Sequence, residues 1–331
     1  MKNDKIIVIL GQTATGKSDF AVEVARQIGG EIISADSRQV YKGMDLGTGK
    51  VPRDKKPSKT KQQKTKTYLY MGIPNHLLDV ASPSKPARAG GIFSVSDFQK
   101  LANKKIEEIL KRNKTPIICG GTGFYIDAIV NGTIFPEVPP NKKLREILEK
   151  KTTEKLFETL IKLDSVRAEN IDKNNKVRLI RAIEIAKALG KVPLLSARQG
   201  LARFQVLKIG LTLPPEILKE RIRARLLSRI KKGMIKEVEN LHKSGVSWKR
   251  LHSFGLEYRY VSLYLQKSRT LPPLKLQQAK DEMIEKLNTE IWHFAKRQKT
   301  WFKRDKSITW IDPRKNTDKN KAMKKVRKFL K

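Results

Sequence analysis

Short apolar runs alternate with segments of helical periodicity through the first 131 residues. The runs contain few polar residues and predict buried strands at Ile6–Leu10, Glu31–Ala35 and Thr115–Cys119. Between and after them, apolar residues recur every three or four positions and predict helices at Lys17–Ile28, Ser94–Arg112 and Gly123–Asn131. Strands and helices in this order favour an α/β fold in which helices cover both faces of a parallel sheet.

The pattern changes after residue 136, where a Val-Pro-Pro segment interrupts it. Residues 137–200 then show only helical spacing, at Lys142–Lys151, Glu154–Leu163 and Lys176–Leu189, which predicts a mainly helical insertion. Apolar and polar residues alternate from Phe204 to Thr212, which predicts a strand that returns to the sheet. Helices are predicted after it near Glu216–Lys231, Met234–Lys243, Leu256–Gln266 and Leu274–Lys299. A last strand is predicted at Ser307–Ile311. We therefore expect a core made of residues 1–136 and 201–312, and a basic C-terminal tail at 313–331.

A phosphate-binding loop joins the first expected strand to the first expected helix. Its residues are Gly11, Gln12, Thr13, Ala14, Thr15, Gly16, Lys17 and Ser18. The two glycines allow successive N–H groups to converge on phosphate oxygens at the start of a helix. Lys17 adds a positive charge, and Ser18 offers a hydroxyl to Mg²⁺. This loop predicts that a polyphosphate or pyrophosphate binds, but it does not identify the reaction.

Polar residues follow the other two strands at the same edge of the expected sheet. Asp36 begins the segment DSRQVY, and Thr122 lies in GGTGFY. Carboxyl ends of parallel strands face the ligand crevice, so both side chains are expected near the phosphate-binding loop. A plainer interpretation of Asp36 is a helix cap or turn residue, and Gly-Gly also occurs in ordinary strand-to-helix turns.

The charge of the chain is strongly positive. It has 71 Lys plus Arg against 33 Asp plus Glu in 331 residues, a formal net charge of +38. This excess favours a polyanionic partner such as nucleic acid, although a lysine-rich composition alone is the competing explanation. Basic runs lie at Lys50–Lys66 and Arg314–Lys331, where we expect a mobile loop and a solvated helix or tail.

Several other classes of protein are disfavoured by the sequence. The only cysteine, Cys119, is expected to be a core residue, which leaves no disulfide framework. The four histidines lack the spacing of a structural zinc site. No apolar run has the length of a membrane span, so we expect a cytoplasmic protein, and we expect it to be a monomer.

The motifs, taken together, resemble the tRNA dimethylallyltransferase family. They are GQTATGKS, DSRQVYKGMDLGTGK, PNHLLD, FSVSDF, GGTGFY, VRLIRAIE and AKRQKTWFKRD, in family order along nearly the whole chain. The resemblance implies transfer of a dimethylallyl group from dimethylallyl pyrophosphate to N6 of an adenosine next to the anticodon of tRNA. It also implies Mg²⁺ carried with the pyrophosphate, and an insertion that contacts the anticodon stem-loop.

The resemblance also implies roles for individual residues. Asp36 would be the general base, and Lys17, Thr122 and Arg225 would stabilise the leaving pyrophosphate, with Ser18 on Mg²⁺. The residues expected to contact tRNA are Asp36, Ser37, Arg38, Gln39, Arg178, Arg181, Lys296 and Arg297. Arg178 and Arg181 share a helix face, which is otherwise typical of a solvated stripe. Arg225 has an equally plain interpretation as one charge on a wet helix, and Trp301 and Phe302 are expected in the core.

The chain departs from the family pattern at four places. Pro74-Asn75-His76 stands where the family usually has Pro-His-His, and residues 254–259 replace a common Gly-Tyr-Lys-Glu. Basic or lengthened loops are expected between Val51 and Lys66 and at residues 84–91. These differences affect loop geometry and the fit of tRNA, but not the three phosphate-side loops.

Three other functions are compatible with parts of the sequence. The phosphate-binding loop also suits a small-molecule kinase, which would consume ATP. A prenyltransferase that acts on free AMP or ATP would share the fold, although the basic excess and the insertion favour tRNA. A non-enzymatic RNA-binding protein or RNA-stimulated NTPase would explain the charge but not DSRQVY and GGTGFY.

Overall fold

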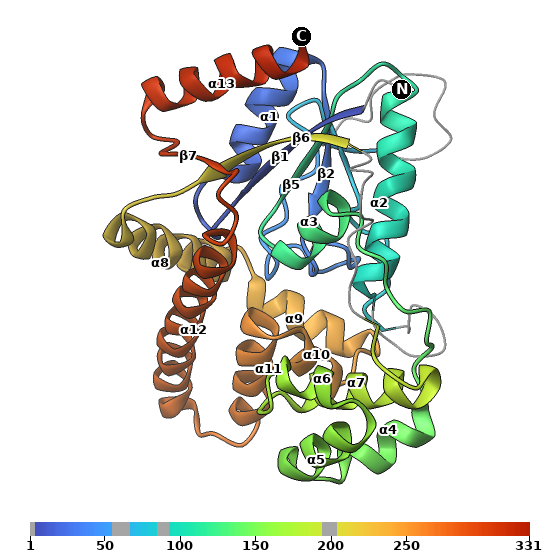
Figure 1. The fold of residues 1–331 in the computed structure, drawn as a ribbon. Coiled ribbons are helices and arrows are strands. Elements are labelled where there is room, and N and C mark those ends of the chain that lie inside the picture. The colour runs from blue at the N-terminus through green and yellow to red at the C-terminus, as the bar shows by residue number, and fades with distance from the viewer. Residues whose placement is uncertain (1–3, 55–66, 85–92, 194–203) are drawn as a thin grey trace.

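The computed structural model describes residues 4–54, 67–84, 93–193 and 204–331, and a seven-stranded sheet lies at its centre (Figure 1). The strand order is β3-β4-β2-β5-β1-β6-β7, and every neighbouring pair is parallel except β3 and β4. The elements expected from the first apolar pattern are β1 (Asp4–Gly11), α1 (Lys17–Ile28), β2 (Glu31–Ala35), α2 (Val95–Leu110), β5 (Pro116–Gly120) and α3 (Gly123–Val130). The predicted α/β fold with a parallel sheet is confirmed.

Two strands were not predicted from the sequence. They are β3 (Tyr68–Tyr70) and β4 (Ile73–His76), at one edge of the sheet. β4 contains a proline and two polar residues in only four positions, so it has no strand pattern of its own. It forms because Asn75 and His76 pair with Ile32 and Ile33 of β2. This edge is therefore created by tertiary pairing.

Alternate residues of the strands pack on different faces of the sheet. Ile7 and Ile9 of β1 belong to a cluster with α1 and with α13 (Asn316–Leu330), whereas Ile6 and Val8 belong to the larger cluster beneath α2 and α3. Figure 1 shows α1 and α13 on one side of the sheet and α2 and α3 on the other. Two helical layers thus enclose the strands, as the alternation of their side chains requires.

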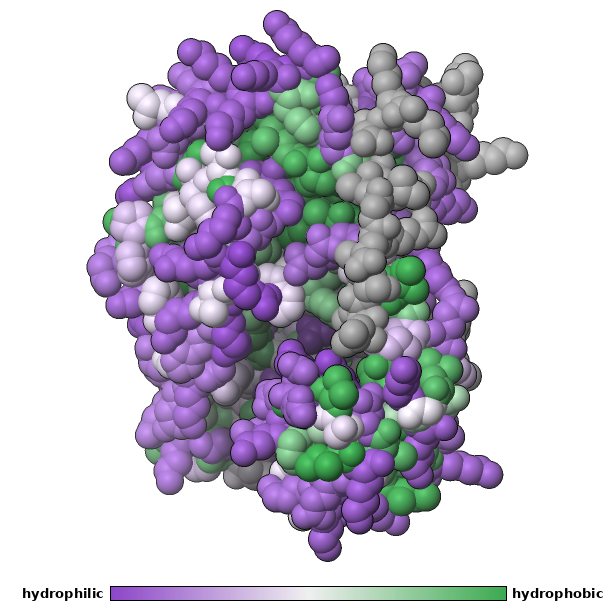
Figure 2. Space-filling model, viewed as in Figure 1, coloured by the Kyte–Doolittle hydropathy of each residue, from purple (hydrophilic) through white to green (hydrophobic). Residues whose placement is uncertain are grey.

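The basic segment at 313–331 is a helix rather than a free tail. Ala322, Met323 and Val326 of α13 are buried in the same cluster as α1. The cationic side chains point outward and give this end of the molecule a hydrophilic surface (Figure 2). The high charge hid an apolar stripe of three residues, which is enough to attach the helix to the core.

The remaining core elements bring the end of the chain back to the sheet. They are β6 (Phe204–Leu211), α8 (Pro215–Lys231), α9 (Met234–Lys243), α10 (Trp248–Phe254), α11 (Leu256–Ser268), α12 (Pro273–Phe302) and β7 (Thr309–Ile311). α10 was not predicted. α12 is 30 residues long and runs from the α11 end of the molecule to the sheet (Figure 1). Its last turns reach the carboxyl ends of the strands, where the candidate site lies.

The insertion forms a small hydrophobic cluster of its own. It comprises α4 (Lys142–Glu149), α5 (Thr153–Leu163), the unpredicted α6 (Ser165–Glu169) and α7 (Lys176–Leu189). These helices lie at the end of the molecule opposite α13 (Figure 1). Parts of the expected loops, at 55–66 and 85–92, and the end of the insertion, at 194–203, lie outside the described residues. Among the helices of the described residues, none has the length and apolar character of a membrane span.

Candidate active site

The phosphate-binding loop turns sharply between β1 and α1. Gly11 has φ 141° and Gly16 has φ 88°, both in the region that favours glycine. A Cβ on Gly11 would lie only 2.3 Å from the carbonyl oxygen of Leu211 on β6. The Thr15 hydroxyl donates to the carbonyl of Gln12 at 2.8 Å and closes the turn. The loop thus ends at the N-terminus of α1, where backbone N–H groups and the helix dipole favour an anion.

Lys17 directs its ammonium back over this loop. Its Nζ donates to the carbonyl oxygen of Gln12 at 2.5 Å. Burial lowers the pKa of Lys17 to about 8. The ammonium therefore loses part of its charge near pH 8 when no anion is bound, and a bound phosphate would favour the charged form.

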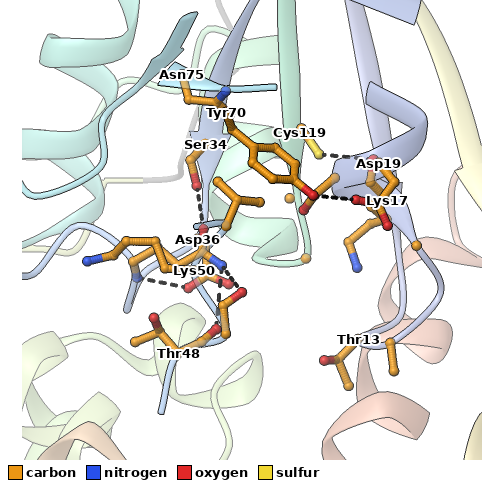
Figure 3. A pocket seen from close by; sticks show the side chains of 18 of the residues that line it. Thr13, Lys17, Asp19, Ser34, Asp36, Thr48, Lys50, Tyr70, Asn75 and Cys119 are labelled. Carbon is orange, nitrogen blue, oxygen red and sulfur yellow. Dashed lines mark hydrogen bonds between the residues drawn. The ribbon is translucent and has the colours of Figure 1, made fainter. Parts of the chain in front are cut away.

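A cavity of about 450 Å³ opens beside the loop, and we call it the phosphate-loop cavity. The loop and α1 form one wall, through Thr13, Gly16, Lys17 and Ser18; β2, β4 and the segment after β2 form another, through Ile32, Ser34, Asp36, Asn75, Thr48, Gly49 and Lys50. Figure 3 shows Lys17 and Asp19 on one side and Asp36, Thr48 and Lys50 on the other. The volume suits a small phosphorylated ligand.

Asp36 follows β2 and combines two roles that the sequence left as alternatives. Its Oδ1 accepts hydrogen bonds from the backbone N–H groups of Arg38 at 2.8 Å and Gln39 at 3.3 Å, so it is a turn residue. Its Oδ2 has no hydrogen-bond partner among the described residues. One carboxylate oxygen therefore fixes the orientation of the side chain, and the other remains available to a ligand.

A second cavity, of about 310 Å³, lies next to the first, and we call it the Phe254 cavity. Its walls include Ser37, Arg38 and Thr122 near the sheet, and residues 254–260 and Arg297 on the helical side. Five residues line both cavities: Thr13, Asp36, Thr48, Arg225 and Phe294. We call these five the junction residues. Asp36 thus stands where a ligand in one cavity could meet a ligand in the other.

Arg225 projects from α8 into this junction. Its guanidinium donates to the carbonyl oxygen of Gly49 at 2.9 Å and to the hydroxyl of Thr13 at 3.4 Å. Burial lowers the pKa of Arg225, and the nearby Arg229 adds to the effect, although arginine stays protonated in proteins. The interpretation of Arg225 as one charge on a wet helix is therefore wrong, because the side chain is largely enclosed beside the phosphate-binding loop.

Two predicted residues near Asp36 are bound to the protein itself. Thr122 lines the Phe254 cavity, and its hydroxyl oxygen accepts the N–H of Ser37 at 3.1 Å, so it supports the Asp36 segment. Gln39 lines the phosphate-loop cavity; its Oε1 accepts the Ser34 hydroxyl at 3.1 Å, and its Nε2 faces the carbonyls of Thr48 and Gly49. Ser37 and Arg38, which are expected to contact tRNA, line the Phe254 cavity.

The predicted basic residues of the insertion and of α12 divide into two kinds. Arg178 of α7 is exposed, and Lys296 and Arg297 are exposed on α12, with Arg297 at the edge of the Phe254 cavity. Arg181 is instead engaged: it donates to buried Glu184 at 2.7 Å and to the carbonyl of Val138 at 2.9 Å. Its guanidinium holds the start of the insertion on α7.

Lys50 and Gln298 are buried polar residues of the site that the sequence analysis missed. Lys50 was expected in a mobile loop, but its side chain is fully buried and pairs with Asp45 at 2.6 Å and Asp79 at 2.5 Å. Gln298 of α12 accepts the N–H of Thr13 at 2.8 Å and donates to the carbonyl of Gly121 at 2.9 Å. The AKRQKTWF segment contains Gln298, but only the folded chain shows that it joins two phosphate-side loops.

Replacing Gln298 with leucine should lower the free energy of unfolding by about 2 kcal/mol, because two backbone groups lose their partners. The phosphate-binding loop should also loosen, so the Michaelis constant for a phosphorylated substrate should rise. Gln277→Leu on the same helix is the matched control, because Gln277 is exposed and, within the described part of the chain, its side chain bonds only to Asp281. Denaturant unfolding of both variants checks this, and equal stabilities would contradict the role given to Gln298.

Trp301, Phe302 and Cys119 were predicted to be core residues, and the structure agrees. Phe302 is buried, and Trp301 packs against the core, where its indole N–H donates to Asp127 at 3.0 Å. Cys119 is buried in the sheet, and burial raises the pKa of its thiol to about 12. A thiol with such a pKa is almost entirely protonated at neutral pH, so it is not a nucleophile there.

Comparison with known proteins identifies the family to which this chain belongs. A family model described as "IPP transferase" matches residues 39–305, and one described as "Isopentenyl transferase" matches residues 4–72. The chain belongs to the IPP transferase family. The resemblance inferred from the motifs is thereby confirmed.

Individual members of the IPP transferase family cover nearly the whole chain. A protein of Treponema denticola named tRNA dimethylallyltransferase 2 is 42% identical over 316 residues, which are 92% of this chain and 95% of the relative. A protein of Syntrophus aciditrophicus named tRNA dimethylallyltransferase 1 is 40% identical over 318 residues, which are 94% of this chain and 94% of the relative. The crystal structure of a tRNA isopentenylpyrophosphate transferase from Bacillus halodurans has a TM-score of 0.66 and 30% identity, and covers 99% of this chain and 97% of its own.

Proposed function

We propose that this chain transfers a dimethylallyl group from dimethylallyl pyrophosphate to N6 of an adenosine next to the anticodon of tRNA, and releases pyrophosphate. The observation that carries the proposal is the position of Asp36 in the wall shared by the two cavities, with the phosphate-binding loop in one of them. The names of its relatives, tRNA dimethylallyltransferases about 40% identical over more than nine tenths of the chain, support the same reaction.

In this proposal the donor occupies the phosphate-loop cavity. The pyrophosphate lies on the N–H groups of the loop, beside Lys17, and Arg225 approaches it from α8. These groups stabilise the negative charge that grows on the leaving oxygens as the bond to the allylic carbon breaks. Their positions are fixed before the reaction, by the bonds of Lys17 to Gln12 and of Arg225 to Gly49.

The site also suits Mg²⁺ carried with the pyrophosphate. The Ser18 hydroxyl lines the phosphate-loop cavity and has no hydrogen-bond partner among the described residues, so its oxygen is available as a ligand. Hydroxyl and phosphate oxygens are the kind of ligand that Mg²⁺ prefers. When bound, the ion would neutralise part of the charge of the pyrophosphate.

The acceptor adenine occupies the Phe254 cavity. Its amine is a weak nucleophile, because the nitrogen lone pair is delocalised into the ring. The free Oδ2 of Asp36 takes the N6 proton as the carbon–nitrogen bond forms, while Oδ1 stays on the backbone of Arg38 and Gln39. The adenine must leave its stack to reach the carboxylate, which is easiest in a single-stranded loop of RNA.

The charge of the protein suits an RNA acceptor rather than a free nucleotide. The net charge of +38 is far larger than recognition of one nucleotide requires. Exposed Arg178, Lys296 and Arg297 are the predicted residues available to phosphates of the anticodon stem-loop. Arg181 would act indirectly, because it is bound to Glu184.

One experiment tests the proposal against its rivals. The protein is incubated with Mg²⁺, labelled dimethylallyl pyrophosphate and either unmodified tRNA, AMP or ATP; labelled ATP is run in parallel. We expect the prenyl label to move to tRNA and not to the free nucleotides. Transfer to AMP or ATP instead would favour the adenylate prenyltransferase, and movement of the γ-phosphate of ATP would favour the kinase or NTPase.

A further inference from the structure

A short loop separates the two cavities, and side chains of α8, α9 and α11 hold it in place. Gly47 and Thr48 line the Phe254 cavity, and Thr48 and Gly49 line the phosphate-loop cavity. We call residues 47–49 the partition loop. Since Thr48 is also a junction residue, a displacement of this loop changes the space in which the two ligands meet.

Glu237 of α9 holds the backbone that leads into the partition loop and the first residue of the loop. Its Oε2 accepts the backbone N–H groups of Asp45 at 3.0 Å and Leu46 at 2.7 Å. Its Oε1 accepts the N–H of Gly47 at 3.0 Å and the hydroxyl of Tyr258 at 2.7 Å. Three consecutive amides therefore converge on one carboxylate, and hydrogen bonds to a charged acceptor are stronger than neutral ones.

Arg229 of α8 holds the carbonyl side. Its Nη1 donates to the carbonyl oxygens of Leu46 at 3.3 Å and Gly47 at 3.1 Å, and its Nη2 pairs with Glu257 at 2.9 Å. Gly47 also packs closely against α11, because a Cβ on Gly47 would lie 2.6 Å from the ring of Tyr258. The loop is thus clamped between α8, α9 and α11.

The partition loop also contacts Arg225, which lies at the junction of the two cavities. The carbonyl oxygen of Gly49 accepts a hydrogen bond from Arg225 at 2.9 Å, and Arg225 is a junction residue. The φ of Gly49 is 61°, and a Cβ there would lie 2.2 Å from the Arg225 guanidinium. The backbone and Arg225 therefore fit closely, so the loop sets where this guanidinium stands.

We propose that Glu237 is a positioning residue that keeps the partition loop closed around the junction, so that the allylic carbon of the donor faces the acceptor amine and not water. The inference rests on the proposed function. When the loop is loosened, water competes: its oxygen attacks the allylic carbon, the carbon–oxygen bond to pyrophosphate breaks, and the bonding pair leaves with the pyrophosphate oxygen. The proton of the water passes to solvent, and the product is dimethylallyl alcohol.

The test measures two products of Glu237→Gln in the same reaction: prenyl groups on tRNA and pyrophosphate released. We expect transfer to fall about tenfold, because small misplacements at a reacting centre are costly. We also expect pyrophosphate released per prenyl group transferred to rise at least about threefold over the wild type. The Michaelis constant for tRNA should stay within about twofold, because Glu237 faces the partition loop rather than the outer surface.

Glu239→Gln is the matched control. Glu239 lies on the same helix and pairs at the surface with Lys236 at 2.9 Å and Lys243 at 2.7 Å, so the same change there should alter neither product. Tyr258→Phe provides a milder variant that removes one hydrogen bond of Glu237 and keeps its charge. It should raise the ratio of pyrophosphate to transferred prenyl by a smaller factor, and it tests the inference if Glu237→Gln does not fold.

A purely structural role for Glu237 would lower transfer and pyrophosphate release together and leave their ratio at the wild-type value. That result, or wild-type behaviour of the variant, would overturn the inference. If Glu237→Gln does not fold, an unchanged ratio in Tyr258→Phe has the same meaning. Failure of the proposed function is distinguishable from these outcomes, because the wild-type protein would then transfer no prenyl group to tRNA.

Discussion

Asp36→Asn should reduce prenyl transfer to tRNA by at least about 100-fold while tRNA affinity changes little. The asparagine side-chain oxygen can replace Oδ1 on the backbone N–H groups of Arg38 and Gln39, so the turn should survive. The amide cannot accept the N6 proton, which is the function that we assign to Oδ2. Single-turnover transfer and equilibrium binding of tRNA, measured on the same preparation, check the two halves of the prediction.

Asp36→Ala separates the two roles of this carboxylate further. It should lose the same transfer activity and, in addition, the turn contacts, so it should be less stable than Asp36→Asn. Ser37→Ala is the neighbouring control for stability, because the contact of Ser37 with Thr122 uses its backbone N–H and should survive the change. Wild-type turnover in Asp36→Asn would remove this residue from the mechanism.

Lys17→Met should lower kcat/KM for dimethylallyl pyrophosphate by about 100-fold or more, because a positive charge that faces the leaving group is lost in an enclosed site. Lys236→Met is the matched control, because it removes the same formal charge from the surface of α9, where Lys236 pairs with Glu239. It should leave kcat/KM for the donor unchanged. Initial rates at varied donor concentration check this. An unaltered dependence on donor in Lys17→Met would count against the assignment.

The pH dependence of donor use provides a second test of Lys17. Because its pKa in the free protein is about 8, Lys17 is charged below this pH and loses its proton as the pH rises through it. Only the charged form attracts pyrophosphate, so kcat/KM for the donor should fall above pH 8, approaching tenfold per pH unit. In Lys17→Met this decline should disappear. A decline that persists in the variant would have to come from another group.

The phosphate-binding loop and the order of the first strands and helices could be predicted because their signals are local. A loop with glycines at fixed spacing, between a short apolar run and a helical pattern, needs no distant partner to be recognised. The position of Asp36 near this loop was predicted for a related reason, because carboxyl ends of parallel strands meet at one edge of the sheet. Its role as general base came only from the family resemblance. The motifs then supplied the family, and the comparisons confirmed it.

The short edge strands, the packing of α13 on the core and the supports of the site could not be predicted in the same way. β4 has no strand pattern and exists because it pairs with β2. The apolar stripe of α13 was hidden by nine Lys or Arg in the last 18 residues. Lys50 was assigned to a mobile loop with its basic neighbours, although it is buried between Asp45 and Asp79.

The amino-acid sequence by itself determined which chemical groups the protein has: a phosphate cradle, a carboxylate after β2 and a large positive charge. Tertiary structure alone decided which of them act together. Gln298 reaches Thr13 across 285 positions, and Glu237 reaches the backbone of Gly47 across 190. Such contacts leave no local periodicity, because each depends on one side chain meeting a backbone group that only the folded sheet and helices bring near.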